Sequence, residues 1–180
     1  MAELEDAARR VSDGDSGAFR LIVERSSTRL IRLGARMLGN VADAEDLAQE
    51  AFVRAHRALV EQQFDGRSSV ETWLYRIVTN VALDQLRARK RRGKLVEPSD
   101  EMAVDAGNSA EARLALRELD GWMSELAPEQ RVVLVLSAME GFSNAEIASM
   151  MNCSEGSVEQ RLVRARTSLK QKRTLEHDQN

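Results

Sequence analysis

The sequence predicts an all-α protein built from two small helical domains that are joined by a flexible linker. Proline, which ends or kinks helices, occurs only 2 times in 180 residues. Apolar side chains recur every three or four residues through both halves of the chain, as on the buried side of an amphipathic helix. This recurrence stops over residues 94–111, where serine, glycine, asparagine and proline are frequent. The composition of that segment is typical of a linker.

Three helices are predicted before the linker, and together they are enough for one compact domain over residues 10–93. The first helix ends at Gly39, and Asn40 or Asp43 can cap the second. A polar loop over residues 61–69 leads to the third. We expect an aliphatic core, because only 4% of residues are aromatic. We take Trp73 as a core residue rather than an exposed stacking platform. The side chains assigned to this core are Phe19, Ile22, Val23, Ser26, Leu30, Leu33, Met37, Ala44, Leu47, Ala48, Ala51, Phe52, Ala55, Leu59, Trp73, Leu74, Ile77, Val81 and Leu86.

A second domain is predicted over residues 112–173. Its middle helix opens at Pro128, a residue favoured at the first helical position, and stops at Gly141. The side chains expected on the buried side of this helix are Val132, Val133, Leu136 and Met139.

The end of this second domain has the arrangement of a helix-turn-helix. We expect a short helix over Asn144 to Met151, a turn over Asn152 to Ser154, and a following helix capped by Ser154. The following helix has one buried stripe, Val158, Leu162, Ala165 and Leu169. A second helix of this size fits the major groove of DNA, although helical hairpins of this kind also occur in proteins that never bind DNA.

Positive charge is concentrated in two of the predicted helical stretches, although the whole chain has a formal net charge of −3. Between Phe64 and Lys94 eight basic side chains stand against three acidic ones, and between Glu155 and Arg173 six stand against two. The segment from Leu95 to Ser154 has eleven acidic and three basic side chains. Two basic stretches on an acidic chain are typical of nucleic-acid contacts, although a charge run by itself is often only solvated surface.

Composition excludes several other classes of protein. The single cysteine, Cys153, permits neither an intramolecular disulfide nor a cysteine-rich zinc site, and we expect no metal and no cofactor. An enzyme is not expected, because no carboxylate pair, histidine cluster or glycine-rich phosphate loop occurs at catalytic spacing. The longest apolar run, Val132 to Leu136, is too short to cross a membrane, and the acidic N-terminus is unlike a secretory signal. We therefore expect a soluble, cytoplasmic protein.

The order and spacing of several short motifs resemble those of bacterial sigma factors. Asp43-Ala-Glu-Asp-Leu-Ala-Gln-Glu-Ala-Phe52 and Thr72-Trp-Leu-Tyr-Arg-Ile77 are similar to region 2 of that family. The motifs similar to region 4 are Leu126-Ala-Pro-Glu-Gln-Arg131, Gly141-Phe-Ser143, Glu146-Ile-Ala148 and Gly156-Ser-Val158. Two regions, a short linker and nothing resembling the intervening region 3 match the extracytoplasmic-function group.

The resemblance implies a transcription initiation factor, typically used in stress responses, that binds core RNA polymerase, directs it to promoters and helps to open the duplex. In similar proteins an Asp-Leu-x-Gln-Glu face docks on the clamp helices of the largest polymerase subunit. Here that face is Asp46, Gln49 and Glu50, which share one side of a helix at i, i+3 and i+4. Without the resemblance the same residues would be read as an ordinary solvated acidic surface.

The loop over residues 61–69 and the helix after it correspond to the part of such proteins that captures the −10 promoter element. An unstacked base needs a small pocket with polar atoms and a flat or aliphatic wall. We expect this pocket to be formed by the loop residues Phe64, Asp65, Gly66, Arg67 and Ser68. The helix residues expected to contact DNA are Asn80 and Asp84, at base edges, and Arg76, Arg87 and Lys90, at the strand backbone.

The last helix corresponds to the one that reads the −35 element. The residues implied at this interface are Ser157, Glu159, Gln160, Arg161, Arg164 and Arg166. Many relatives have a basic residue and a serine where this chain has Glu159 and Gln160. We therefore expect the promoter sequence read here to differ from the common one.

Two other classes of function stay open at the level of sequence. A stand-alone helix-turn-helix regulator would bind its operator without polymerase, whereas an enzyme of nucleic-acid metabolism would need a catalytic cluster that the sequence does not display. The partners expected from the resemblance are core RNA polymerase, promoter DNA and an anti-sigma factor, since many relatives are held inactive by one.

Overall fold

The computed structural model describes residues 2–93 and 110–177, and within these ranges the chain forms helices without a β-strand. The all-α fold class predicted from the sequence is confirmed. The predicted linker lies outside the described residues apart from its last two positions, which begin α5 (Ala110–Glu125). The boundaries proposed for the two domains stay a prediction.

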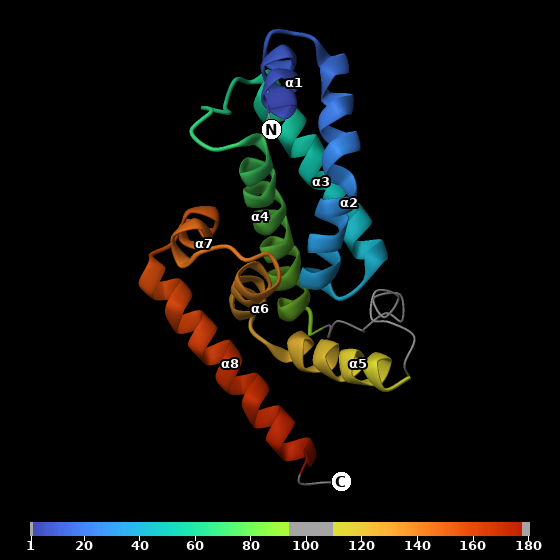
Figure 1. Cartoon of the computed structure of the whole chain (residues 1–180), viewed down its shortest axis with the longest axis vertical. Helices are drawn as coiled ribbons and strands as arrows, with labels where there is room; N and C mark the ends of the chain where they lie inside the picture. The colour runs from blue at the N-terminus through green and yellow to red at the C-terminus, as the bar shows by residue number, and fades with distance from the viewer. Residues whose placement is uncertain (1, 94–109, 178–180) are drawn as a thin grey trace.

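The N-terminal bundle consists of four helices, drawn from blue to green in Figure 1: α1 (Ala2–Ser12), α2 (Phe19–Leu38), α3 (Val41–Val60) and α4 (Val70–Arg91), with a 3₁₀ turn η1 (Ser16–Ala18) before α2. The turn between α2 and α3 uses Gly39, whose φ of 88° favours glycine, and Asn40, whose side chain accepts a hydrogen bond from the Asp43 N–H at 2.7 Å. At Gly34 the backbone of α2 approaches α3 closely, since a Cβ there would lie 2.7 Å from Leu47 Cδ2. The two helices therefore form the tightly packed centre of the bundle.

Helix α1 was not predicted from the sequence. Its buried side chains, Leu4, Ala7, Ala8 and Val11, lie at i, i+3, i+4 and i+7, so the signal was present but was obscured by the acidic composition of this segment. The Glu5 carboxylate accepts a hydrogen bond from the N–H of Val70, at the start of α4. The bundle therefore has four helices, where the sequence analysis counted three.

The C-terminal unit consists of α5, α6 (Pro128–Leu134), a π-helical turn labelled η3 (Val135–Met139), α7 (Asn144–Met151) and α8 (Glu155–His177). Proline opens α6 as predicted, and α7 has the predicted bounds. Asn152 adopts the left-handed conformation between α7 and α8, and Ser154 Oγ accepts a hydrogen bond from the N–H of Ser157 at 3.2 Å. The predicted helix-turn-helix is therefore present, with Val158, Leu162 and Ala165 buried.

The prediction that Met139 is buried was wrong, because its side chain is 49% exposed. The π-helical turn is the physical reason. It is closed by a hydrogen bond from the N–H of Glu140 to the carbonyl of Val135, so one extra residue enters the turn and the side chains after it rotate. Met139 moves to the surface, and Glu140 takes an inward position.

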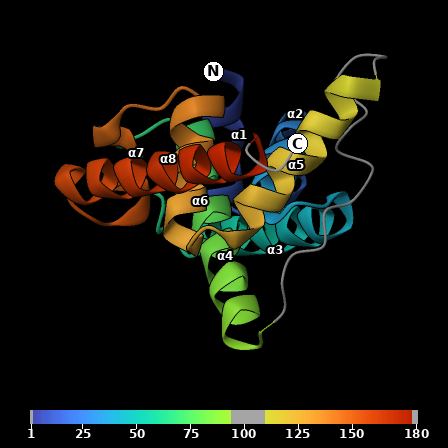
Figure 2. The ribbon, with the colours of Figure 1, turned by 90° about the horizontal axis from the view of Figure 1, so that it is seen from below.

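The two halves of the chain pack against each other along α4. Helices α6 and α7 both contact α4, η3 contacts α2, and α8 packs on α6 and α7 (Figure 1). Viewed from below, the last turns of α4 project beyond the helices around them (Figure 2). Buried apolar side chains of both halves belong to one continuous cluster. The helix that was predicted to bind the −10 element is therefore also the main contact between the two halves.

A buried guanidinium distinguishes the core of the C-terminal unit. Arg131 is 2% exposed, and its Nε and Nη1 atoms have no hydrogen-bond partner in the described part of the chain. Burial lowers the pKa of Arg131 to about 10, although the negative charge of Asp120 acts in the opposite direction. Attraction to Asp120 therefore offsets part of the cost of burying this charge.

Candidate nucleic-acid interface

The three residues predicted to bind polymerase lie together on the solvent side of α3. Asp46, Gln49 and Glu50 are exposed, whereas Leu47 and Ala48 of the same turns are buried in the bundle. Arg54 lies one turn after Glu50, and its Nη2 is 2.5 Å from the Glu50 carboxylate. The surface is therefore negatively charged at Asp46, whereas the charge of Glu50 is offset by Arg54.

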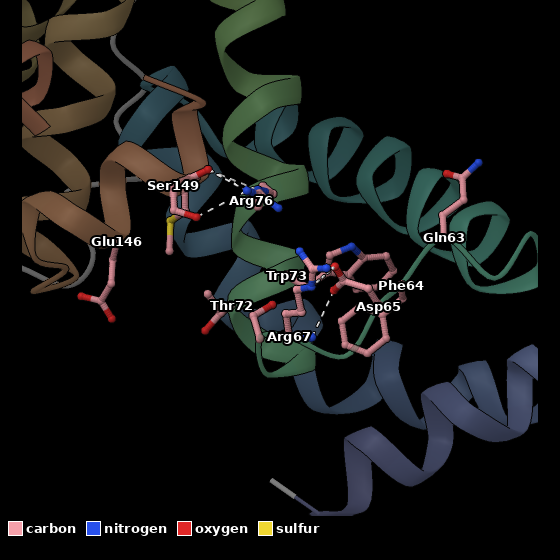
Figure 3. A pocket seen from close by; sticks show the side chains of 11 residues that line it. Gln63, Phe64, Asp65, Arg67, Thr72, Trp73, Arg76, Glu146 and Ser149 are labelled. Carbon is pink, nitrogen blue, oxygen red and sulfur yellow. Dashed lines mark hydrogen bonds and ion pairs between the residues drawn. The ribbon is translucent and has the colours of Figure 1, made fainter. Parts of the chain in front are cut away.

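A cavity of about 410 Å³ lies between the loop over residues 61–69 and the N-terminal half of α4 on one side and α7 on the other (Figure 3). The residues that line it are Gln63, Phe64, Asp65, Arg67, Ser68, Thr72, Trp73 and Arg76 from the N-terminal bundle and Glu146, Ser149 and Met150 from α7. Four of the five loop residues predicted to form a base pocket are among them. The fifth, Gly66, is not in the lining, but its φ of 67° permits the turn that the loop makes there.

The aromatic part of the cavity wall is a pair of rings, Phe64 and Trp73, whose centroids are 4.8 Å apart (Figure 3). Trp73 was predicted to be a core residue, but it is only half-buried and borders the cavity. The apolar stripe of α4 continues to the edge of the bundle at this point, which explains why periodicity alone placed Trp73 inside.

The loop is held by hydrogen bonds of its own. The Asp65 carboxylate accepts from the backbone N–H of Arg67 at 3.1 Å and lies 3.3 Å from Nε of the same residue. Ser69 then caps α4, because its hydroxyl accepts from the N–H of Thr72 at 3.1 Å. The loop therefore enters α4 in a fixed direction, with Arg67 exposed at its tip.

The five residues of α4 predicted to contact DNA divide into two groups. Asn80, Asp84 and Lys90 are exposed. Arg76 and Arg87 are exposed as well but also contact the C-terminal unit: Arg76 Nη2 donates to the Ser149 carbonyl at 2.8 Å, and Arg87 Nε lies 2.8 Å from the Glu129 carboxylate. Arg87 Nη1 also lies 3.9 Å from the carboxylate of Asp84 on the same helix. Burial tends to raise the pKa of Glu129, but the hydrogen bond from Arg87 and its charge bring it below the usual value.

The outer side of α8 is open to solvent. Glu159, Gln160, Arg164 and Arg166 are all exposed, and Ser157 is half-buried at the start of the helix. Arg161 is half-buried too, and its Nη1 lies 3.2 Å from Cys153 Sγ in the preceding turn. Of the arginines predicted to contact DNA here, Arg161 thus lies against the protein, and Arg164 and Arg166 project outward.

A carboxylate that the sequence analysis did not single out joins the two halves. Glu140 contacts Arg36 Nη1 at 2.5 Å and accepts a hydrogen bond from the Tyr75 hydroxyl at 3.0 Å. Burial and the nearby charge of Glu140 raise the pKa of Tyr75 to about 12. The guanidinium of Arg29 lies 5.1 Å from the centre of the Tyr75 ring, and the Phe142 ring meets it edge-on at 5.1 Å. No local sequence signal reveals this cluster, because its members are brought together by tertiary packing.

Residues 2–93 and 110–177 contain no group of three or more His, Cys, Asp or Glu side chains that could hold a metal ion. His56 packs edge-on against Phe19 with ring centroids 5.0 Å apart. Within the same ranges, no helix is both long and apolar enough to cross a membrane.

Comparison with known proteins confirms the resemblance noted in the sequence. Residues 22–92 match the family model for sigma-70 region 2, and residues 116–169 match the model for sigma-70 region 4. The extracytoplasmic-function RNA polymerase sigma-E factor of Escherichia coli is 34% identical over 179 residues, which cover 91% of this chain and 90% of that protein. The chain belongs to the extracytoplasmic-function group of sigma factors.

Solved structures agree with this assignment. The fold resembles CnrH, in its complex with the cytosolic domain of CnrY, with a TM-score of 0.65, 28% sequence identity and 96% of each chain covered. It also resembles the sigma factor RpoE of Bartonella quintana, solved with the anti-sigma factor NepR, with a TM-score of 0.65, 24% identity, and 87% of this chain and 96% of that chain covered. This sigma factor is therefore an RNA polymerase-binding initiation factor that acts at specific promoters, rather than an enzyme or a stand-alone regulator.

Proposed function

We propose that this sigma factor uses three separate surfaces in initiation. The acidic face of α3 docks on core polymerase, the loop over residues 61–69 with α4 captures an unstacked base of the −10 element, and the outer side of α8 reads the −35 element. The observation that carries this proposal is the wall of the cavity that the N-terminal bundle forms beside α4. It combines the rings of Phe64 and Trp73, which are tilted by 45° to each other, with the polar groups of Asp65 and Arg67.

The cavity suits an extruded base for a physical reason. Stacking on an aromatic ring stabilises a base by about 1–3 kcal/mol whatever its identity, and discrimination then comes from nearby polar atoms. Trp73 offers an aromatic surface in the wall, and the loop supplies a carboxylate and a guanidinium. Asn80 and Asp84 lie further along α4 and are exposed, where they can meet the bases that follow.

The docking face on α3 suits a basic partner. Carboxylates at an interface speed the encounter between oppositely charged surfaces and fix its register, and those that become buried in charge pairs also contribute affinity. Asp46 and Glu50 carry this charge, and Gln49 adds an amide between them.

We further propose that an anti-sigma factor controls this sigma factor in the cytoplasm. The support is the likeness to RpoE of Bartonella quintana, whose structure was solved with the anti-sigma factor NepR. Such a partner would act where polymerase and promoters are found.

Run-off transcription with core polymerase on a genomic library tests the proposed function directly. We expect transcripts from a limited set of promoters that share −10 and −35 sequences, and none from core polymerase alone. A Trp73→Ala variant should lose opening at these promoters while keeping its affinity for core. Sequence-specific DNA binding by the free chain, with no stimulation of core polymerase, would instead support a stand-alone regulator.

A further inference from the structure

The ion pair between Arg36 and Glu140 joins the two halves of this sigma factor. It is buried more deeply than the ion pair between Arg87 and Glu129, which also joins them. The Glu140 side chain is 10% exposed, whereas Glu129, which pairs with Arg87, is 28% exposed. Glu140 has two partners on two different helices of the N-terminal bundle, Arg36 on α2 and Tyr75 on α4. A charge with little access to water depends on such partners, whereas exposed pairs contribute little.

The π-helical turn puts Glu140 in this position. Its extra residue turns Met139 outward and Glu140 inward, and a hydrogen bond from the N–H of Phe142 to the carbonyl of Leu136 closes the chain after it. Phe142 then packs edge-on against the ring of Tyr75. π-Helical turns of this kind often lie at functional sites.

The same arrangement occupies the DNA-binding side of α4. With the halves closed, Ser149 accepts from Arg76, Glu129 pairs with Arg87, and Glu146 borders the cavity. Hydrogen bonds from Ser143 lower the pKa of Glu146, so this carboxylate is ionised and repels phosphate. Arg76 and Arg87 therefore direct part of their hydrogen-bonding capacity to the C-terminal unit, and these contacts compete with any DNA strand that approaches α4.

We propose that Glu140, Arg36 and Tyr75 form a latch that closes the chain on itself, so that the C-terminal unit and promoter DNA compete for the same arginines of α4. The latch is built into the fold and closes the chain without any second protein. The competition rests on the proposed function of α4 in binding the −10 element, whereas the closure itself does not.

Closure can be measured by energy transfer between dyes on the two halves. Val60 on α3 and Val163 on α8 are 50% and 57% exposed, so cysteines there can be labelled in a Cys153→Ser background. Glu140→Gln keeps the shape of the side chain and removes its charge. We expect it to lower the transfer efficiency of the free chain, and Tyr75→Phe, which removes the hydroxyl alone, to do so to a smaller extent.

Glu125→Gln is the matched control. It makes the same change of charge in the same unit, but Glu125 pairs with Lys172 inside the C-terminal unit and should leave the distance unchanged. The exchange Arg36→Glu with Glu140→Arg restores opposite charges across the contact and should restore closure. Circular dichroism of each variant verifies that the helices are intact.

Binding of a fluorescein-labelled single-stranded DNA of mixed sequence tests the competition. Glu140→Gln should bind it about 10- to 100-fold more tightly than wild type, the range expected when a charge-assisted hydrogen bond no longer opposes opening. Unchanged energy transfer in Glu140→Gln would overturn the latch. Opening without tighter DNA binding would overturn the competition. If wild-type chain failed to direct core polymerase, the proposed function would fail, and the distance measurement, made without DNA or polymerase, would still decide the latch.

Discussion

The two basic helices of this sigma factor, α4 and α8, differ in what their arginines contact. On α4, Arg76 and Arg87 are engaged by groups of the C-terminal unit. On α8, Arg164 and Arg166 project into solvent. The cause is position: α4 is packed by helices of its own bundle and also by α6 and α7, whereas α8 lies at the edge and packs on one side. The closed chain therefore presents the surface proposed to read the −35 element and engages two arginines of the surface proposed to bind the −10 element.

This difference implies an order of events at a promoter. The exposed side of α8 and the acidic face of α3 are available first, and Arg76 and Arg87 of α4 are released from the C-terminal unit only after the two halves separate. If the three surfaces act independently, a substitution in one of them should leave the functions of the other two unchanged.

The largest effect is expected from the acidic face of α3, whose three residues belong to neither basic helix. Replacing Asp46, Gln49 and Glu50 together with Ala should weaken binding to core polymerase by about 2–5 kcal/mol, because charged contacts at an interface are lost. The side chains are exposed, so helical content should not change. A competition assay for core polymerase measures this, and a triple variant that competes as well as wild type would show that the face is only solvated surface.

The second largest effect is a change in promoter specificity, which we expect from substitutions on α8 alone. A carboxylate in the major groove can accept from the amino group of cytosine, and a glutamine amide can pair with the edge of adenine, each contributing about 1–3 kcal/mol of discrimination. Glu159→Lys with Gln160→Ser should therefore shift the preferred −35 sequence and leave the −10 preference unchanged. Selection from a promoter library randomised at the −35 element decides this, and identical selected sequences would show that the two side chains do not read bases.

The next prediction compares the two sets of arginines directly. Arg164→Ala should weaken all promoters about equally and reduce the slope of affinity against salt by about one, as loss of a phosphate contact does. Arg76→Ala also removes the hydrogen bonds to Ser149 that help to close the chain. Its net effect on single-stranded DNA binding by the free chain should therefore be smaller than that of Arg164→Ala on duplex binding. A larger loss of DNA affinity for Arg76→Ala would contradict the view that Arg76 is held by the C-terminal unit in the free chain.

The smallest effect is expected in the titration of Tyr75, which lies at the contact between the two halves. Tyr75 is the single tyrosine of the chain, and its pKa is raised to about 12 in the closed form. Because the folded pKa lies above the ordinary value of about 10, the stability that this group contributes is complete below that value and is lost as pH rises towards 12. Tyrosinate absorbance should have its midpoint near 12 in wild type and closer to the ordinary value in Glu140→Gln. Equal midpoints would show that Glu140 does not affect Tyr75.

Much of the fold followed from local patterns. The bounds of α7, the cap at Ser154 and three of the four residues of the buried stripe of α8 were predicted, and Asn40 was one of two candidates for the cap of α3. Caps and helical periodicity depend on residues within one or two turns of each other, which is why they could be predicted. Helix α1 was missed although its stripe is regular, since it is short and acidic. Most of the residues predicted around the base pocket do line one cavity, and Trp73, which was taken as a core residue rather than a stacking platform, also contributes to its wall.

The sequence by itself determined the helices, the helix-turn-helix and the segregation of charge, because each of these depends on neighbours along the chain. Tertiary structure decided which charged groups are free. Glu140 is an unremarkable acidic residue in the sequence, and only the π-helical turn and the packing of η3 on α2 bring it to Arg36 and Tyr75. Arg76 and Arg87 were predicted to contact DNA, yet both have partners in the C-terminal unit that are more than forty positions away in the chain. Contacts over such separations depend on how whole helices pack, and no local pattern of residues records them.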